Sequence, residues 1–248
     1  MSQVKVRVGM KVWDDDVEME MTLPAGPVRL ESLLPVFQRI ADSLVDLAAE
    51  RAGEQGGRVS CRKGCGACCR QIVPISAVEA RSIGRLVEEL PEPRRTEVRA
   101  RFAKARERLA EAGLLAKLVD TEDFEESEVR SFGLAYFHLG IPCPFLEEES
   151  CSIHSERPIS CREYLVTSPA ANCADPKPGT IDRVELPGKV WTALARAGSA
   201  APSERFNRWV PLILAPDWAS AHPDVSEARP IEEVFTGVFD ELARRKGA

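Results

Sequence analysis

The sequence predicts a mostly α-helical α+β fold, in which an N-terminal β-hairpin and amphipathic helices accompany an irregular, cysteine-rich segment. Three observations predict it: strict alternation of apolar residues over 4–23, several apolar runs of helical period, and eight cysteines gathered in two groups. A chain of 248 residues has the size of one compact domain. We therefore expect a single domain over 1–248, with a cysteine-cluster core over 60–175 and a C-terminal helical part over 187–248.

Composition and charge exclude several classes of protein. The net charge of -6 opposes the basic surface that binding to nucleic acid requires. The N-terminal segment has no continuous apolar core typical of a signal peptide, and no apolar stretch reaches the roughly 18 residues of a membrane span. We expect a cytoplasmic protein without a nucleic-acid or membrane partner. In that reducing compartment, clustered cysteines indicate metal binding or catalysis rather than disulfides.

The N-terminal third predicts a hairpin and then a helix. Apolar residues alternate in two runs, which predicts a β-hairpin over 4–23: Val4, Val6, Val8, Met10 and Val12, then Val17, Met19, Met21 and Leu23. Apolar residues then recur at helical spacing from Val28 to Arg51, and Gly53 ends the run. Because proline is tolerated only in a first turn, the regular helix is expected to begin near Pro35.

Two further helices are expected after the first cysteine group. Ser76 and Glu79 have the spacing of a capping box, which predicts a helix that starts there and stops before Pro91. A long helix is predicted over 94–119. The acidic segment 120–128 is interpreted as a solvated linker, since dense like charges repel and bury little apolar surface.

From 141 to 187 the chain is rich in Pro, Ser and Cys and has no sustained period. It cannot build a core of its own, and a bound metal would supply the missing order. The C-terminal part returns to helical spacing, and its last helix has a clean apolar stripe: Ile231, Val234, Phe235, Val238, Phe239 and Leu242.

The first cysteine constellation consists of Cys61, Cys65, Cys68 and Cys69. The same spacing would place all four side chains on one face of a helix. In this alternative interpretation, the cysteines are small apolar residues packed in the core. Gly64 and Gly66 argue against that helix, because glycine costs about 1 kcal/mol in a helix interior but lets backbone N–H groups approach a thiolate in a loop. We expect all four cysteines to be metal ligands.

The second constellation consists of Cys143, Cys151, Cys161 and Cys173, spaced more widely. Pro142 and Pro144 bracket Cys143, much as a Cys-Pro step follows the last ligand of some ferredoxin motifs. All four are candidate metal ligands, although a free buried thiol is an equal alternative for Cys173.

Cations lie next to the cysteines in an otherwise acidic chain: Arg62, Lys63, Arg70, Arg157 and Arg162. A four-thiolate site carries a net charge of about -2 with Zn²⁺ or an oxidised [4Fe–4S] core, and nearby cations offset it. We expect Arg157 and Arg162 to serve the bound cofactor. His154 follows Cys151 at a spacing compatible with a shared metal, but a non-ligand role is favoured.

The sequence resembles the YkgJ-like, or CxxCxxCC, family of cysteine-cluster proteins described as zinc- or iron-chelating, which includes flagellin lysine-N-methylase. The motifs that carry the resemblance are Cys-Gly-Ala-Cys-Cys-Arg at 65–70, Cys-Pro-Phe-Leu at 143–146, Cys-Ser-Ile-His at 151–154 and Arg-Pro-Ile-Ser-Cys-Arg at 157–162. The family pattern often has an aromatic residue where this chain has His154. The resemblance implies a metal or iron-sulfur centre, and likeness to the methylase would add S-adenosylmethionine as methyl donor.

We therefore expect an iron-sulfur cluster, [4Fe–4S] in type, held by cysteines of both constellations for redox or group-transfer chemistry. The first alternative is a structural or delivery zinc module without catalysis, because thiolate sites suit both metals. The second is an S-adenosylmethionine-dependent protein lysine methylase, although the chain has no glycine-rich strand-to-helix turn of a nucleotide-binding unit. A protein or a small molecule could be the substrate, and no catalytic residue is assigned.

Overall fold

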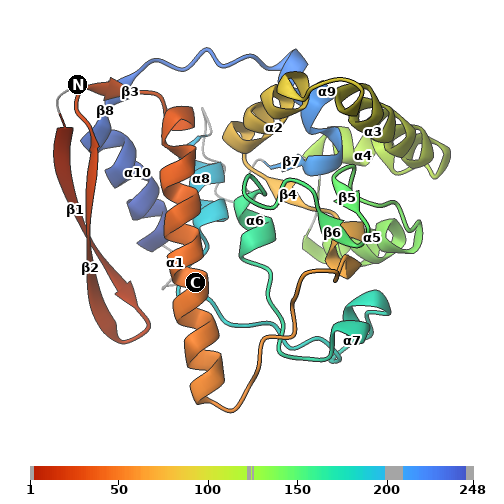
Figure 1. Cartoon of the computed structure of the whole chain (residues 1–248), viewed down its shortest axis with the longest axis horizontal. Helices are drawn as coiled ribbons and strands as arrows, with labels where there is room; N and C mark the ends of the chain where they lie inside the picture. The colour runs from red at the N-terminus through yellow and green to blue at the C-terminus, as the bar shows by residue number, and fades with distance from the viewer. Residues whose placement is uncertain (1–2, 122–123, 125, 199–208, 244–248) are drawn as a thin grey trace.

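The computed structural model describes residues 3–121, 124, 126–198 and 209–243. Its N-terminal hairpin confirms the predicted one: β1 (Gln3–Val12) pairs antiparallel with β2 (Asp15–Pro24), with Val4 opposite Leu23. One face of this hairpin packs on the core and the other faces solvent, which explains the alternating sequence. The hairpin lies at one edge of the molecule, beside α10 and α1 (Figure 1).

The first apolar cluster joins the two ends of the chain. It contains η1 (Leu30–Leu33), α1 (Leu34–Glu54), α8 (Val190–Ala197) and α10 (Ile231–Ala243). Phe37 and Phe235 stack at its centre with ring centroids 5.2 Å apart. Pro35 lies in the first turn of α1, as predicted. The short strands β3 (Pro27–Val28) and β8 (Arg229–Pro230) pair next to this cluster.

A second apolar cluster lies on the other side of the molecule. It is built mainly from α2 (Ala77–Glu89), α3 (Arg94–Glu111) and α9 (Ala215–Ala221), together with β4 (Pro74–Ile75), β7 (Val210–Pro211) and η4 (Leu212–Leu214). The capping box at Ser76 and Glu79 is present. No described helix has both the length and the apolar character needed to cross a membrane.

Two sequence predictions in this region are wrong. The helix expected over 94–119 ends at Glu111, because Gly113 adopts a φ of 71° and starts a turn before α4 (Leu115–Val119). The segment 120–128 is not wholly a solvated linker. Phe124 is buried, with its ring edge-on to Phe132 and centroids 4.8 Å apart. Helix α5 (Glu126–His138) begins within this segment, whereas residues 122–123 and 125 lie outside the described residues.

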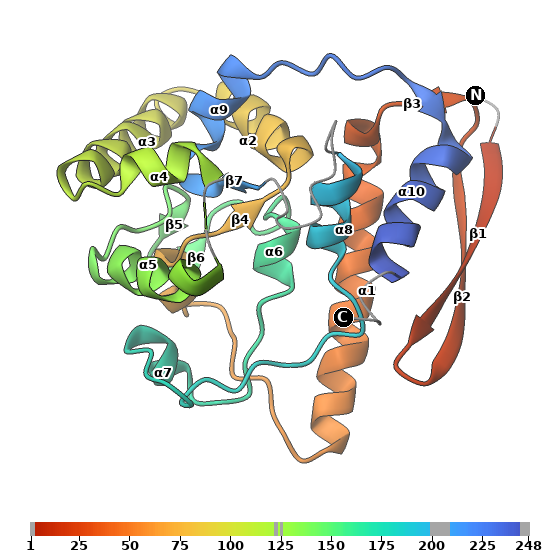
Figure 2. The same ribbon diagram turned by 180° about the vertical axis from the view of Figure 1, so that it is seen from behind.

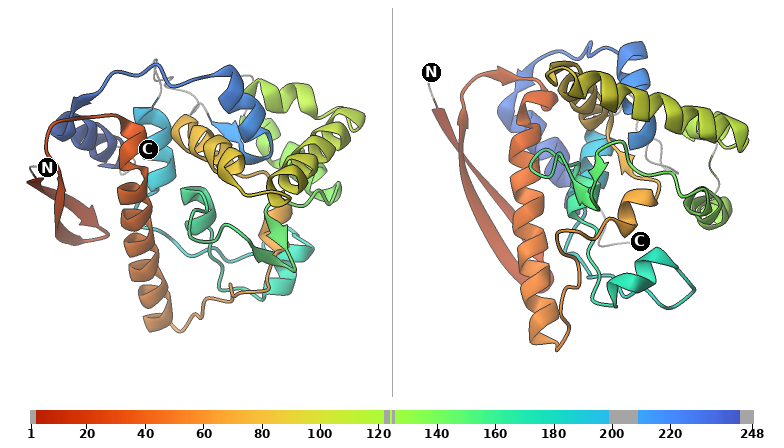
Figure 3. Two further views of the ribbon diagram at one scale, coloured as in Figure 1. Left: turned by 45° about the horizontal axis from the view of Figure 1, so that its top comes forward. Right: turned by 45° about the vertical axis from the view of Figure 1, so that its right-hand side comes forward.

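The cysteine-rich part contains only short elements, as its composition predicted. They are η2 (Ala67–Arg70), β5 (Leu146–Glu147), β6 (Ser150–Cys151), α6 (Ile159–Arg162) and α7 (Ala170–Ala174). Helix α6 lies between α1 and the β5–β6 hairpin, seen both from the front and from behind (Figures 1 and 2). In the turned views the segment around α6 again lies next to α1, whereas α7 lies toward the edge of the molecule (Figure 3). The helical clusters on either side therefore hold this segment.

Candidate metal centre

All eight cysteines are free thiols, and short backbone links draw their segments together. The amide of Cys143 donates to the carbonyl of Cys69 at 2.7 Å, and Leu146 pairs with Cys151 across β5 and β6. Upstream of Cys61, the Ser60 hydroxyl donates to the carbonyl of Ser168 at 2.6 Å. Helix α7, which carries Cys173, packs against η2. The structure thus brings both cysteine constellations into one region.

Gly66 lets the first constellation approach the β5–β6 hairpin closely. A Cβ at this position would lie 2.5 Å from Glu149 Oε2 and 2.7 Å from Leu146 Cδ1. Arg70 also holds the first constellation against the β5–β6 hairpin. It donates to the carbonyl of Gly66 and forms an ion pair with Glu149 at 2.6 Å. A side chain at this position would therefore displace the ends of the Glu149 and Leu146 side chains from this packing.

Three thiols of the second constellation, Cys143, Cys151 and Cys161, interact with one another. Burial raises the pKa of Cys161 well above its usual range, and Cys143, Cys68 and Cys151 raise it further. Burial likewise raises the pKa of Cys143 to about 12, with Cys151 and Cys68 adding to the effect. Such electrostatic coupling requires short separations. Cys68 of the first constellation is therefore a neighbour of the second.

The fourth thiol of the second constellation, Cys173, interacts instead with thiols of the first constellation. Burial raises the pKa of Cys173, and Cys61, Cys65 and Cys68 add to that increase. Cys173 is only 4% exposed and lies beside the first constellation, so it is buried without being isolated from the other thiols. A side-chain hydrogen bond with Cys69, followed by burial, raises the pKa of Cys68. Cys68 thus interacts electrostatically with thiols of both groups.

Of the two arginines expected to serve the cofactor, Arg157 lies among the thiols. Its charge opposes the rise in pKa of Cys61, Cys68 and Cys151. Its buried Nε has no hydrogen-bond partner among the described residues. This cation can offset the negative charge of bound thiolates.

Arg162 has a different position. Its side chain is 7% exposed, and its guanidinium forms an ion pair with Asp42 of α1 at 2.6 Å. It also donates to the carbonyls of Arg157 and Ser155. These bonds attach α6 to α1 and hold the backbone next to Arg157. A direct contact of Arg162 with a cofactor stays a prediction.

Glu79 is a positioning residue that sequence reasoning treated only as part of a helix cap. It is 1% exposed, and its carboxylate accepts hydrogen bonds from the Ser76 amide at 2.9 Å and from the Ile159 amide at 2.7 Å. Glu79 therefore connects the start of α2 to α6, two residues before Cys161. The capping-box spacing of Ser76 and Glu79 predicts the start of a helix. It does not predict the hydrogen bond between Glu79 and the distant Ile159 amide.

The donor set fits a thiophilic metal, although its side chains do not form a closed coordination shell. No group of three or more His, Cys, Asp or Glu side chains in the described part of the chain has metal-site geometry. Each cysteine has one χ1 angle with three staggered positions, so neighbouring thiols can turn toward a shared metal.

His154 is exposed. The charge of Arg157 is the main cause that lowers the pKa of His154, and partial burial lowers it further.

Comparison with known proteins agrees with this chemistry. Residues 60–179 match the sequence pattern of the CxxCxxCC family, described as "Putative zinc- or iron-chelating domain". No curated protein and no solved structure matches the chain. The matched range contains all eight thiols as well as Arg157 and Glu79. Residues 60–179, just under half of the chain, thus match the CxxCxxCC family model of zinc- or iron-chelating domains, which supports metal binding by this segment.

Proposed function

We propose that the converging thiols bind an iron-sulfur cluster of the [4Fe–4S] type, and that the chain uses it in redox or group-transfer chemistry. The observation that carries this proposal is the position of Cys68. Its thiol interacts with Cys69 and also influences thiols of both groups, including Cys173 and Cys161.

The number and arrangement of the thiols favour a multi-iron cluster over one structural zinc. A tetrahedral zinc uses four ligands, whereas eight free thiols lie in this region. Adjacent side chains such as Cys68 and Cys69 diverge in regular backbone, but their thiols contact each other in η2. A cluster several ångströms across, or two neighbouring centres, can use such a pair more readily than one ion.

The exposure of the thiols also favours a reactive centre over a closed structural site. Cys61 is exposed, Cys173 is buried, and the other six are partly exposed. A cavity of about 1100 Å³ borders the cysteine segments through Gln71 and Tyr164. A bound [4Fe–4S] cluster would supply one-electron transfer there. The chain itself would supply thiolates, the compensating charge of Arg157 and the fixed backbone at Glu79.

Two alternatives have less support. A structural or delivery zinc module would need only four of the thiols and no adjoining cavity. An S-adenosylmethionine-dependent protein lysine methylase gains no support from the topology, since every strand pair among the described residues is antiparallel and a βαβ unit requires parallel strands.

Anaerobic purification followed by metal and sulfide analysis tests the proposal. We expect brown protein with visible charge-transfer absorption and equal amounts of iron and acid-labile sulfide. The His154→Ala variant is a matched control and should keep the same spectrum, because this exposed side chain lies outside the thiol group. Colourless protein that contains only stoichiometric zinc would contradict the iron-sulfur proposal and favour the zinc module.

A further inference from the structure

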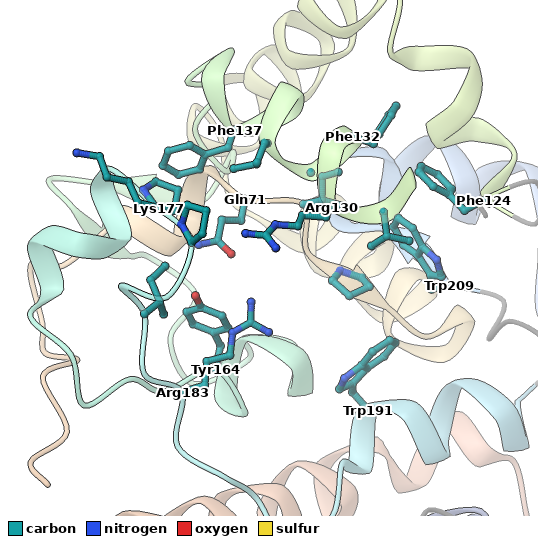
Figure 4. A pocket seen from close by; sticks show the side chains of 18 of the residues that line it. Gln71, Phe124, Arg130, Phe132, Phe137, Tyr164, Lys177, Arg183, Trp191 and Trp209 are labelled. Atoms are coloured by element: carbon teal, nitrogen blue, oxygen red, sulfur yellow. The ribbon is translucent and has the colours of Figure 1, made fainter. Parts of the chain in front are cut away.

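We propose that the cavity next to the cysteine segments is a binding site for a small organic anion with a flat aromatic body. The cavity has a volume of about 1100 Å³, which is large enough for a small-molecule ligand. It lies between α5, the loop after η2, the segment around residues 176–183 and α8 (Figure 4). This inference goes beyond the proposed cluster and does not depend on which metal the thiols bind.

The walls of the cavity are rich in aromatic rings. They come from five separate segments: Phe124, Phe132 and Phe137, then Tyr164, Trp191 and Trp209. Aromatic side chains bury a flat ring well through stacked or edge-to-face contacts. An aromatic lining drawn from distant parts of the chain therefore favours a ligand with a planar apolar body.

Among the described residues that line the cavity, the charged ones are basic: Arg130, Lys177, Arg183 and Arg196. Lys177 has an ion pair with Asp175 at 2.9 Å, and Arg196 has one with Glu241 at 3.8 Å. No ion pair with a carboxylate whose side chain is described involves Arg130 or Arg183. Two guanidinium groups thus remain to bind an anionic group, and guanidinium forks match carboxylate and phosphate oxygens.

Two neutral polar side chains, those of Tyr164 and Gln71, line the cavity together with these arginines. The Tyr164 hydroxyl is buried without a hydrogen-bond partner among the described residues, which is a costly state that a ligand oxygen would relieve. Arg183 lies over the Tyr164 ring, 5.3 Å from its centroid. In Figure 4, the side-chain ends of Gln71 and Arg130 extend into the cavity on the side facing Tyr164 and Arg183. These polar groups therefore lie near one another in the cavity (Figure 4).

The cavity and the thiol group share backbone. Gln71 follows Cys69 by two residues, and Tyr164 follows Cys161 by three. A ligand bound between Arg130 and Arg183 would therefore lie beside the metal centre, as the substrate of that centre would.

Isothermal titration of the metal-loaded protein with 2-naphthoate, 2-naphthyl phosphate and neutral 2-naphthamide tests the site. We expect at least one anion to bind about tenfold or more tightly than the amide, because charge-assisted hydrogen bonds add to the shared apolar contacts. The carboxylate and phosphate probes identify the preferred anionic group. Arg130→Gln and Arg183→Gln should each weaken anion binding by about tenfold, and Tyr164→Phe by less.

The control Arg229→Gln changes an exposed arginine outside the cavity and should bind the anion as the unchanged protein does. Metal content and circular dichroism of every variant separate loss of the cavity from loss of the fold. Equal affinity for the anions and the amide, or no anion binding by folded, metal-loaded protein, would overturn the inference. Neither result would alter the metal analysis on which the cluster proposal depends.

Discussion

The backbone amide of Cys143 donates a 2.7 Å hydrogen bond to the carbonyl oxygen of Cys69. This bond joins the two cysteine constellations through the main chain, independently of any thiol. A second main-chain link, from the Leu146 amide to the Cys143 carbonyl, starts the β5–β6 hairpin on which Gly66 packs. Substitution of single thiols should therefore remove ligands without separating the segments that carry them.

Arg157→Gln should weaken metal binding by about threefold to tenfold without unfolding the protein. Arg157 opposes the rise in pKa of Cys61, Cys68 and Cys151, and its loss makes their thiolates harder to form. Competition with a chelator measures the affinity. The matched control Arg7→Gln, on the exposed face of the hairpin, should leave it unchanged. Equal affinity of the Arg157 variant and the control would show that this charge does not act on the centre.

Metal binding should continue to strengthen as the pH rises above about 9.5, where ordinary thiols with a pKa of about 8.5 are already largely ionised. Metals bind thiolates, so each thiol that is protonated below its pKa releases one proton when metal binds. Burial and neighbouring thiols raise the pKa of Cys143 to about 12 and that of Cys161 above its usual range. Chelator competition at pH values up to about 10 measures this dependence. An affinity that stops rising near pH 9.5, as ordinary thiols would give, would contradict these shifts.

Glu79→Ala should lower the free energy of unfolding by about 2–4 kcal/mol, because the buried amides of Ser76 and Ile159 would lose their acceptor. Glu79→Gln keeps one acceptor oxygen and should therefore lower the free energy of unfolding by less than Glu79→Ala. Urea unfolding of the metal-free protein measures both. Glu18→Gln, at an exposed position of the hairpin, is the control and should change stability by no more than about 0.5 kcal/mol. An equal effect of Glu79→Ala and the control would contradict the anchoring role.

Gly66→Ala should destabilise the protein by about 1–3 kcal/mol, since the added methyl group would clash with Leu146 and Glu149. Gly237→Ala is the matched control. Nothing lies within 4 Å of a Cβ at that position in α10, so this change should stabilise the helix by up to about 1 kcal/mol. Thermal unfolding measures both variants. A Gly66 variant as stable as the unchanged protein would mean that the β5–β6 hairpin can move away.

Local patterns in the sequence predicted much of the fold. The alternation over 4–23 predicted the hairpin, and the spacing of Ser76 and Glu79 predicted the start of α2. These features depend on neighbouring residues, which a sequence displays directly. The break of the long helix at Gly113 was missed, because the apolar stripe continues past a glycine whose conformation the sequence does not reveal.

Cysteine spacing selected all eight cysteines as candidate ligands, and their role as ligands stays a prediction. The contacts that support the thiol group could not be predicted from the sequence. The ion pair of Arg162 with Asp42 and the bond of Glu79 to the Ile159 amide join residues far apart in sequence. The cavity lining likewise comes from separate segments, none of which has a distinctive motif. Such contacts depend on tertiary packing and leave no periodic signal.

The measurement that most directly tests the central claim, that both constellations build one metal centre, is bound metal per folded chain in single cysteine variants. We predict that Cys68→Ser, Cys143→Ser and Cys161→Ser each lose most of the metal, because each thiol interacts with members of the shared group. The His154→Ala control should keep it. Full metal content in both Cys143→Ser and Cys161→Ser, with complete loss in Cys61→Ser, would contradict this account and assign the centre to Cys61–Cys69 alone.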